Sequence, residues 1–181
     1  MDDGVTTLPD GSRVSKKDFT DLWNKLDTEV LCHKLRPIHF TCKEMDRQNV
    51  KIAAQTLSHS VAVLFKKLFP TQTTKISLSE FIDTTYSAFN ILNSTCDEHA
   101  NFTKSAFGGQ NLENQLEILN KFRDLISNTK FSGKPRFNNG LIICVKATIL
   151  LQKQLSEKFN ISKLKTRYIT QETYYFLSLQ I

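Results

Sequence analysis

Apolar residues recur every three to four positions over most of the chain, and this spacing predicts amphipathic helices. The strongest pattern runs from about Lys43 to Phe69 and ends at Pro70, which cannot continue a helix. A shorter helix is predicted after Ser15, because serine favours the position that caps a helix start. The apolar stripe of the short helix is Phe19, Leu22, Trp23 and Leu26, and that of the long one is Ala53, Ala54, Leu57, Val61, Leu64, Phe65 and Leu68.

The second half of the chain carries further helical patterns. Ser77 and Glu80 have the spacing of a capping box, which predicts a helix that opens there and reaches Leu92. Apolar residues at helical spacing also predict helices over 112–126 and from about Leu141 to Phe159. A last helix is expected over 170–181.

The segments between these helices are polar, and none of them alternates as a strand would. Residues 1–14 are predicted to be a flexible lead-in, 94–111 a loop with Gly108 and Gly109 at a flexible tip, and 132–140 a basic turn. Five or six amphipathic helices with short connections predict an all-α fold, a helical bundle.

Composition narrows the class of protein. The net charge is 24 − 18 = +6, and 40% of residues are hydrophobic, which is typical of a folded domain. No apolar run approaches the roughly 18 residues that span a bilayer, and the first residues are acidic, so neither a membrane segment nor a secretory signal is predicted. The cysteines at 32, 42, 96 and 144 form no C-x-x-C pair. We therefore expect reduced thiols and a nuclear or cytoplasmic protein that is not secreted.

Clustered cations are the main chemical signal in the residues themselves. Lysine near the start of a helix opposes the helix dipole unless an anion lies there, so these clusters favour an anion site over a merely solvated face. No metal-ligand spacing, nucleophile–base set or Walker-type loop accompanies them, so no enzyme is predicted. The clusters are Lys34, Arg36, Lys43, Arg47 and Lys51, and then Lys130, Lys134 and Arg136.

Residues 34–62, KLRPIHFTCKEMDRQNVKIAAQTLSHSVA, resemble the P-element transposase family, which includes the THAP-domain transposase-derived proteins. The segment over 50–62 is similar to the family's signature helix. DFTDLWNKLD at 18–27, FNILNS at 89–94 and ITQETYYFLSLQI at 169–181 resemble further family segments in the same order. The resemblance covers about residues 11–181.

The resemblance implies a fold and a function in DNA transposition. In the family, a helical insertion domain that binds GTP interrupts an RNase H-like nuclease core. By resemblance, residues 15–169 are that GTP-binding-type insertion domain, and 170–181 are a truncated helix with which the chain re-enters the core. Two of the family's three catalytic carboxylates lie upstream of the matched region, and the third falls at Tyr174, whose oxygen is neutral at pH 7. The resemblance therefore implies a domain without catalytic activity.

The resemblance also implies a set of site residues for GTP, with Mg²⁺. Lys34, Lys51 and Ser60 fall where the family places groups that face the phosphates, and Phe89 falls where a ring stacks on the base, although packing in the core is the alternative role for Phe89. Asn93 is expected to hydrogen-bond the nucleotide or to cap its own helix.

Two departures from the family pattern concern the guanine base. The family uses Asp to accept the two N–H donors of guanine, and those places read Asn90 and Gln171 here. An amide offers one acceptor and one donor, so selectivity for guanine is expected to weaken. The sequence thus leaves two functions open. One is a non-catalytic, transposase-derived domain that binds a guanine nucleotide. The other is a helical interaction module that binds protein or a nucleic-acid backbone through its basic face.

Overall fold

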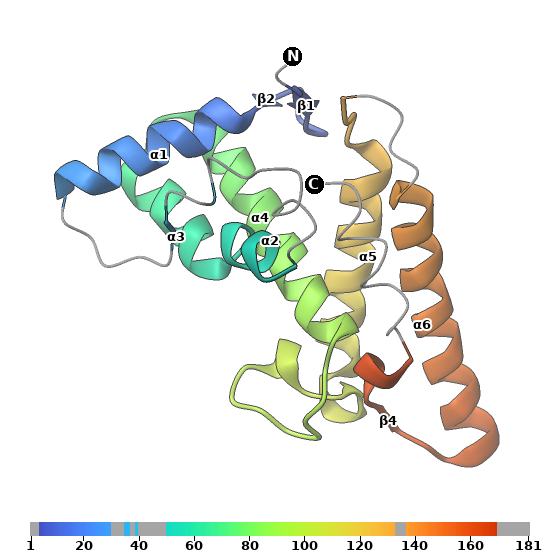
Figure 1. The fold of residues 1–181 in the computed structure, drawn as a ribbon. Helices are drawn as coiled ribbons and strands as arrows, with labels where there is room; N and C mark the ends of the chain where they lie inside the picture. The colour runs from blue at the N-terminus through green and yellow to red at the C-terminus, as the bar shows by residue number, and fades with distance from the viewer. Residues whose placement is uncertain (1–3, 30–34, 37–38, 40–49, 133–136, 170–181) are drawn as a thin grey trace. The chain divides into compact units, whose positions relative to one another are not determined.

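A computed structural model describes residues 4–29, 35–36, 39, 50–132 and 137–169, and the fold is all-α as predicted (Figure 1). Two pairs of very short antiparallel strands, β1 with β2 and β3 with β4, accompany the helices. The α-helices are α1 (Lys16–Glu29), α2 (Val50–Thr56), α3 (His59–Leu68), α4 (Thr73–Leu92), α5 (Leu112–Asn128) and α6 (Phe137–Phe159). The strands are β1 (Thr6–Thr7), β2 (Arg13–Val14), β3 (Phe107–Gly108) and β4 (Lys163–Leu164), and the 3₁₀ turns are η3 (Phe102–Lys104), η4 (Gly109–Asn111) and η5 (Thr166–Tyr168).

The chain divides into two compact units. The first holds the described residues up to 86 together with 128–132, and the second holds 87–127 and 137–169. Helix α4 begins in the first unit and its last turns belong to the second. The predicted helix over 170–181 lies outside the described residues.

The core of the first unit forms where α1 packs on α3. Leu22 and Leu26 of α1 are buried, and the ring of Phe19 meets that of Phe65 edge to face, with centroids 5.5 Å apart. Each such side chain contributes about 1.5–3 kcal/mol when it leaves water. The predicted apolar stripes of these two helices thus supply this core.

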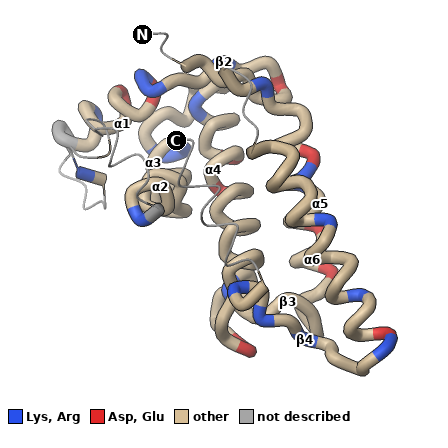
Figure 2. The backbone as a smooth tube through the Cα atoms, turned by 45° about the vertical axis from the view of Figure 1, so that its right-hand side comes forward, with Lys and Arg blue, Asp and Glu red and all other residues tan. Residues whose placement is uncertain are grey.

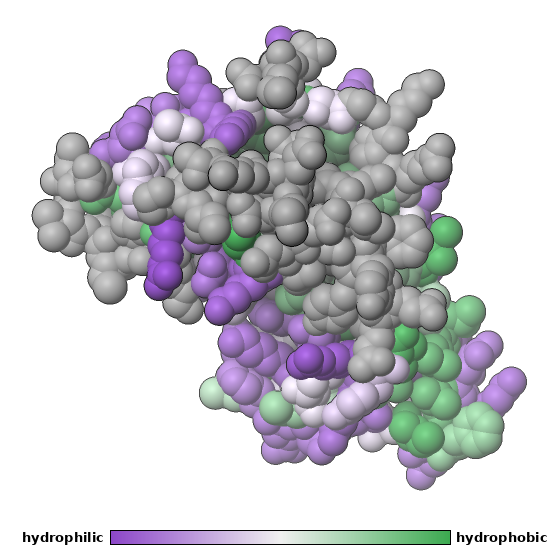
Figure 3. All heavy atoms as spheres, viewed as in Figure 1, coloured by the Kyte–Doolittle hydropathy of each residue, from purple (hydrophilic) through white to green (hydrophobic). Residues whose placement is uncertain are grey.

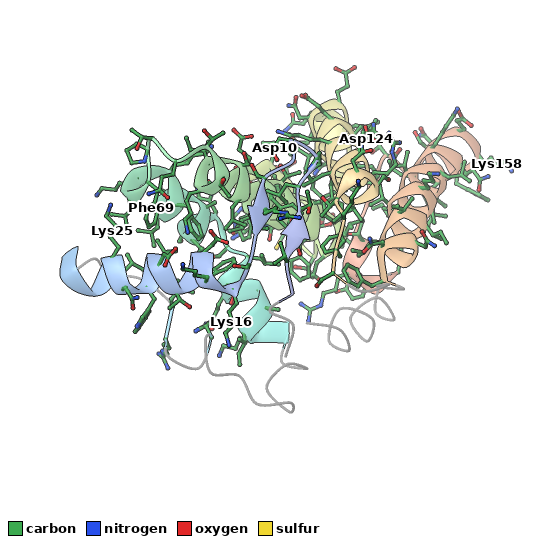
Figure 4. The ribbon with its side chains drawn as sticks, turned by 90° about the horizontal axis from the view of Figure 1, so that it is seen from above. Asp10, Lys16, Lys25, Phe69, Asp124 and Lys158 are labelled. Carbon is green, nitrogen blue, oxygen red and sulfur yellow. The ribbon has the colours of Figure 1, made fainter. Side chains whose placement is uncertain are left out.

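A buried lysine joins α1 to the start of α4. Lys75 is only 5% exposed, and its Nζ lies 2.7 Å from Asp18 Oδ1 and 3.0 Å from Asp21 Oδ2. Lys25, also on α1, donates to the carbonyl of Leu68 at 2.6 Å, and its Nζ lies 4.8 Å from the ring centroid of Phe69. Figure 4 shows Lys25 close to Phe69. Both cations are satisfied inside the fold, which a buried charge requires.

The long helix predicted over 43–69 is interrupted. Within its described part, α2 ends at Thr56 and α3 begins at His59, because Ser58 adopts an extended backbone with φ −98° and ψ 154°. The predicted capping box at Ser77 is also wrong: α4 already begins at Thr73. Ser77 lies inside the helix, and its hydroxyl donates to the carboxylate of Asp10.

The N-terminal segment, predicted as loose, forms a hairpin. Its turn is closed by Ser12 N–H, which donates to Asp10 Oδ1 at 2.9 Å, and by Gly11 at φ 85°. Thr7 exchanges two backbone hydrogen bonds of 2.8 Å with Lys130. The Ser77 hydroxyl lowers the pKa of Asp10, because it donates to the charged form of that carboxyl. Hydrogen bonds and the buried side chains of Leu8 and Val14 thus hold a segment that has no periodic apolar pattern.

In the second unit, α5 and α6 lie side by side (Figures 1 and 2), and α6 begins four residues before its predicted start. The segment before α5 wraps around the fully buried amide of Gln115. Gln115 accepts from the N–H of Gly108 at 2.9 Å and donates to the carbonyl of Phe102 at 3.0 Å.

Gly108 was predicted at a flexible loop tip, and this prediction is wrong. The residue is buried and belongs to β3, which pairs with β4. Its φ is 122°, and a Cβ added there would lie 2.1 Å from the carbonyl oxygen of Ser162. Only glycine fits this conformation and this close approach of two backbones.

Gly108→Ala is therefore expected to destabilise the protein by about 3 kcal/mol or more, because it adds strain at φ 122° to a backbone clash. Gly140→Ala is the matched control: a Cβ on this helical residue meets nothing within 4 Å, and alanine favours a helix by up to about 1 kcal/mol. Urea unfolding measures both free energies. A Gly108→Ala protein as stable as the parent would contradict the assigned backbone.

Candidate functional site

The predicted site residues fall into two groups in the described structure. Lys51 on α2 and Ser60 on α3 belong to the first unit, and Phe89, Asn90 and Asn93 at the end of α4 belong to the second. Lys34 and Gln171 lie outside the described residues. Each group is described by itself below.

In the first unit, the start of α3 carries hydroxyl groups suited to an anion, and Lys51 lies on the preceding helix α2. Lys51 and Ser60 are both exposed. Ser58 is the N-cap residue, but its side chain makes no capping bond, and its Oγ is buried without a hydrogen-bond partner. The N-terminal end of a helix carries a partial positive charge and unpaired N–H groups. A hydroxyl, an ammonium and a helix start are the groups that bind phosphate oxygens.

His59 adds a titratable group to the same turn. Its Nδ1 lies 2.6 Å from Asp83 Oδ1, and its ring centroid lies 6.3 Å from that of Tyr86. Asp83 therefore holds the imidazole on the side of α4, and this pair fixes the first residue of α3. Sequence reasoning left His59 among the scattered histidines, because its partner lies 24 residues away in the chain.

In the second unit, two amides share one face at the end of α4. Asn90 and Asn93 are three residues apart, and both are half-buried. Asn90 Nδ2 and Asn93 Oδ1 are buried and have no hydrogen-bond partner. Buried polar atoms are nearly always paired in folded proteins, so an unpaired donor beside an unpaired acceptor calls for an explanation.

A buried threonine holds this last turn of α4 in place. Thr166 is fully buried, and its hydroxyl donates to the carbonyl of Ile91 and accepts from Ser94 N–H at 3.0 Å. The N–H of Arg167 also donates to the carbonyl of Ser94, at 3.2 Å. These bonds join the segment after β4 to the end of α4, where the two asparagines lie. The sequence offered no signal for Thr166, since its partners lie more than 70 residues away.

Two lysines of the second unit are paired with carboxylates. Figure 2 shows Lys and Arg interspersed with Asp and Glu along the described chain. Lys163 lies 3.1 Å from Glu98, and Lys165 lies 2.8 Å from Asp97. The hydrogen bond from Lys165 to Asp97 raises the pKa of that lysine. Of the predicted clusters, Lys34, Lys43, Arg47, Lys134 and Arg136 lie outside the described residues.

Other possible sites are limited in the part of the chain that the structure describes. No three His, Cys, Asp or Glu side chains gather there in a way that would hold a metal ion. None of the described helices is both long and apolar enough to cross a membrane. A polar hollow of about 430 Å³ lies in the second unit, and it includes none of the predicted site residues. Its lining is Glu98, His99, Ala100, Phe102, Ser105, Gln110 and Asn111.

Comparison with known proteins tests the resemblance. The Transposable element P transposase of Drosophila melanogaster is 25% identical over 181 residues, which are 95% of this chain and 24% of that protein. The chain is related to P element transposase. A chain in the Drosophila P element transposase strand transfer complex has the same helical fold, with a TM-score of 0.77 and 23% identity. No family model matches the sequence.

The relationship to P element transposase confirms the predicted resemblance and the helical fold. The solved chain is matched over 97% of the present chain and 41% of its own length. The present chain therefore spans about a quarter of the curated transposase and two-fifths of the solved one. The seven nucleotide-site residues and the cofactor stay predictions.

Proposed function

We propose that this chain is a helical domain, derived from a P-element-like transposase, that binds a guanine nucleotide with Mg²⁺ and does not itself cut or join DNA. The chain's relationship to P element transposase supports the transposase origin. The nucleotide is inferred from the candidate site, as follows.

The observation that carries the proposal is the pair of unpartnered amide atoms at the end of α4. Asn90 Nδ2 is a donor and Asn93 Oδ1 is an acceptor, both buried. A base bound there would supply a donor to Asn93 Oδ1, whereas Asn90 Nδ2 would be satisfied only where the edge of the base presents an acceptor. Leaving such a group unpaired costs about 1–3 kcal/mol, which a ligand recovers on binding. Half-buried Phe89, next in the chain, offers an aromatic face to the same base.

The first unit separately contains groups suited to phosphate oxygens. Lys51 supplies a positive charge, and Ser58 and Ser60 supply hydroxyls beside the start of α3. By resemblance, Lys34 would also face phosphates, and Gln171 would face the base. A triphosphate needs several such donors because its charge is spread over many oxygens.

Asn90 also sets how selective the site is. If the Asn90 oxygen accepts from guanine N1–H, the Nδ2 beside it meets a second donor, N2–H, and cannot pair with it. The family's Asp would accept both. We therefore propose that the domain binds GTP with reduced preference over ATP.

The absence of catalysis is inferred from residue types. By resemblance, the one catalytic carboxylate position within this chain is Tyr174, and a neutral phenol does not replace a carboxylate as a ligand for Mg²⁺. The role proposed for the nucleotide is thus structural, as a bound cofactor.

Thermal unfolding with GTP, ATP or heparin, each with Mg²⁺, tests the proposal. A GTP concentration a hundredfold above Kd adds about 2.7 kcal/mol, which raises Tm by roughly 5–10 °C for a chain of this size. A larger rise with GTP than with ATP and none with heparin is expected. Equal rises with all three polyanions would instead support binding of nucleic-acid backbone through the basic face.

Lys51→Ala is expected to weaken GTP binding roughly ten- to hundredfold, because a charge-assisted hydrogen bond is worth about 1.5–3 kcal/mol. Lys66→Ala, at the exposed C-terminal end of α3, is the control and should bind as the parent does. Isothermal titration calorimetry compares the three proteins. An unchanged isotherm for Lys51→Ala would remove Lys51 from the site.

Asn90→Asp is expected to raise the preference for GTP over ATP about tenfold, because a carboxylate replaces the unpaired Nδ2 with a second acceptor. Asn114→Asp, on the exposed side of α5, adds the same charge elsewhere and should leave the preference unchanged. The ratio of the two Kd values is the measurement. No gain in the ratio would show that Asn90 does not face the base.

A further inference from the structure

Helix α6 carries two rows of residues on opposite sides, and both rows have the spacing i, i+4, i+7, i+11. One stripe is buried in the second unit: Leu141, Val145, Thr148 and Gln152. The other is exposed and lies two residues further along: Ile143, Ala147, Leu150 and Gln154. Two residues correspond to about 200° of rotation, so the exposed stripe lies on the opposite side of the helix.

The apolar members of the exposed stripe are large. Ile143 is 64% exposed and Leu150 is 56% exposed, and Phe159 and Ile161 beyond them are also exposed. Figure 3 shows hydrophobic residues gathered over this side of the molecule, along α6 and the turn that follows it. An ordinary surface helix has one apolar stripe, which faces its own core, so a second stripe indicates a partner.

The spacing of the second stripe is that of a coiled-coil seam. Ile143, Ala147, Leu150 and Gln154 follow the i, i+4, i+7, i+11 pattern of alternating d and a positions over two heptads. In this register, Lys146 and Lys153 both take the g position, at the edge of the seam. The charge at such edge positions selects the partner helix and its orientation.

The edge charges argue against a second copy as the partner. In an antiparallel pair of α6 helices, Lys146 would lie beside Lys153 of the other copy, and like charges repel. In a parallel pair, Lys146 would lie beside Leu151 and Lys153 beside Lys158 of the other copy, so neither lysine would meet a counter-charge. The acidic residue of α6 is Glu157, 3.9 Å from Lys153 and outside the two heptads.

We propose that the exposed face of α6, defined by Ile143, Ala147, Leu150 and Gln154 with Lys146 and Lys153 at its edge, docks a helix that carries an apolar seam flanked by Asp or Glu. Acidic residues on that helix would pair with the two lysines while its apolar residues cover Ile143 and Leu150. This surface is separate from the nucleotide site proposed above and does not depend on it.

Two synthetic helices test the proposal with the full chain. Both have about three heptads with Leu at the a and d positions, and they carry either Glu or Lys at the e and g positions. Fluorescence anisotropy at low salt is expected to show the Glu peptide binding at least about tenfold more tightly than the Lys peptide. Equal binding of the two peptides, or no binding of either, would overturn the proposal.

Matched variants separate the apolar and charged contributions. The double variant Ile143→Ser with Leu150→Ser should lose at least about tenfold in affinity for the Glu peptide. The double variant Lys146→Glu with Lys153→Glu should bind the Lys peptide more tightly than the Glu peptide. Val63→Ser and Lys121→Glu, exposed on α3 and α5, are the controls and should change neither. Circular dichroism checks that every variant keeps the parent's Tm.

Sedimentation equilibrium tests whether a second copy of the chain covers this face instead. A monomer at all concentrations is expected. A dimer that is lost in the Ile143→Ser and Leu150→Ser protein would show that a second copy covers the face, and would overturn the proposal.

Discussion

The buried hydroxyl of Thr166 ties two distant parts of the second unit together. It donates to the carbonyl of Ile91 and accepts from the N–H of Ser94, so the end of α4 cannot fray. The last turns of a helix normally leave their carbonyls unpaired, and a side chain from elsewhere in the chain supplies the missing donor here. Asn90 and Asn93 lie at this end of the helix, so the proposed nucleotide site depends on the backbone that these bonds hold.

The first unit uses charge inside its fold in a similar way. Lys75 is buried between Asp18 and Asp21, and Lys25 lies against the ring of Phe69. Buried ion pairs add little net stability, because desolvation offsets their attraction, but they permit few alternative arrangements. These contacts therefore specify how α1 lies against α3 and α4 within this unit.

Two surfaces are proposed for this chain, and the transposases that it matches are much longer. A nucleotide bound at the end of α4 and a helix docked on α6 are different kinds of contact. The first is polar and demands exact hydrogen-bond partners. The second is apolar, with charge only at its edge.

The sequence by itself determined most of the helices and the resemblance to P element transposase, because both depend on the local order of residues. Apolar spacing located α1, α5 and most of α6, and the segment over 50–62 carried the resemblance. It also named Asn90 and Asn93, although only through that resemblance. Tertiary structure alone decided where distant residues meet. Ser58 breaks a continuous apolar stripe, Ser77 bonds to Asp10 instead of capping α4, and Gly108 meets the backbone of Ser162. The physical reason is that the spacing of apolar residues shows which face of a helix avoids water. A hydrogen bond between residues about 70 positions apart produces no repeating pattern in the sequence, so the sequence alone does not predict it.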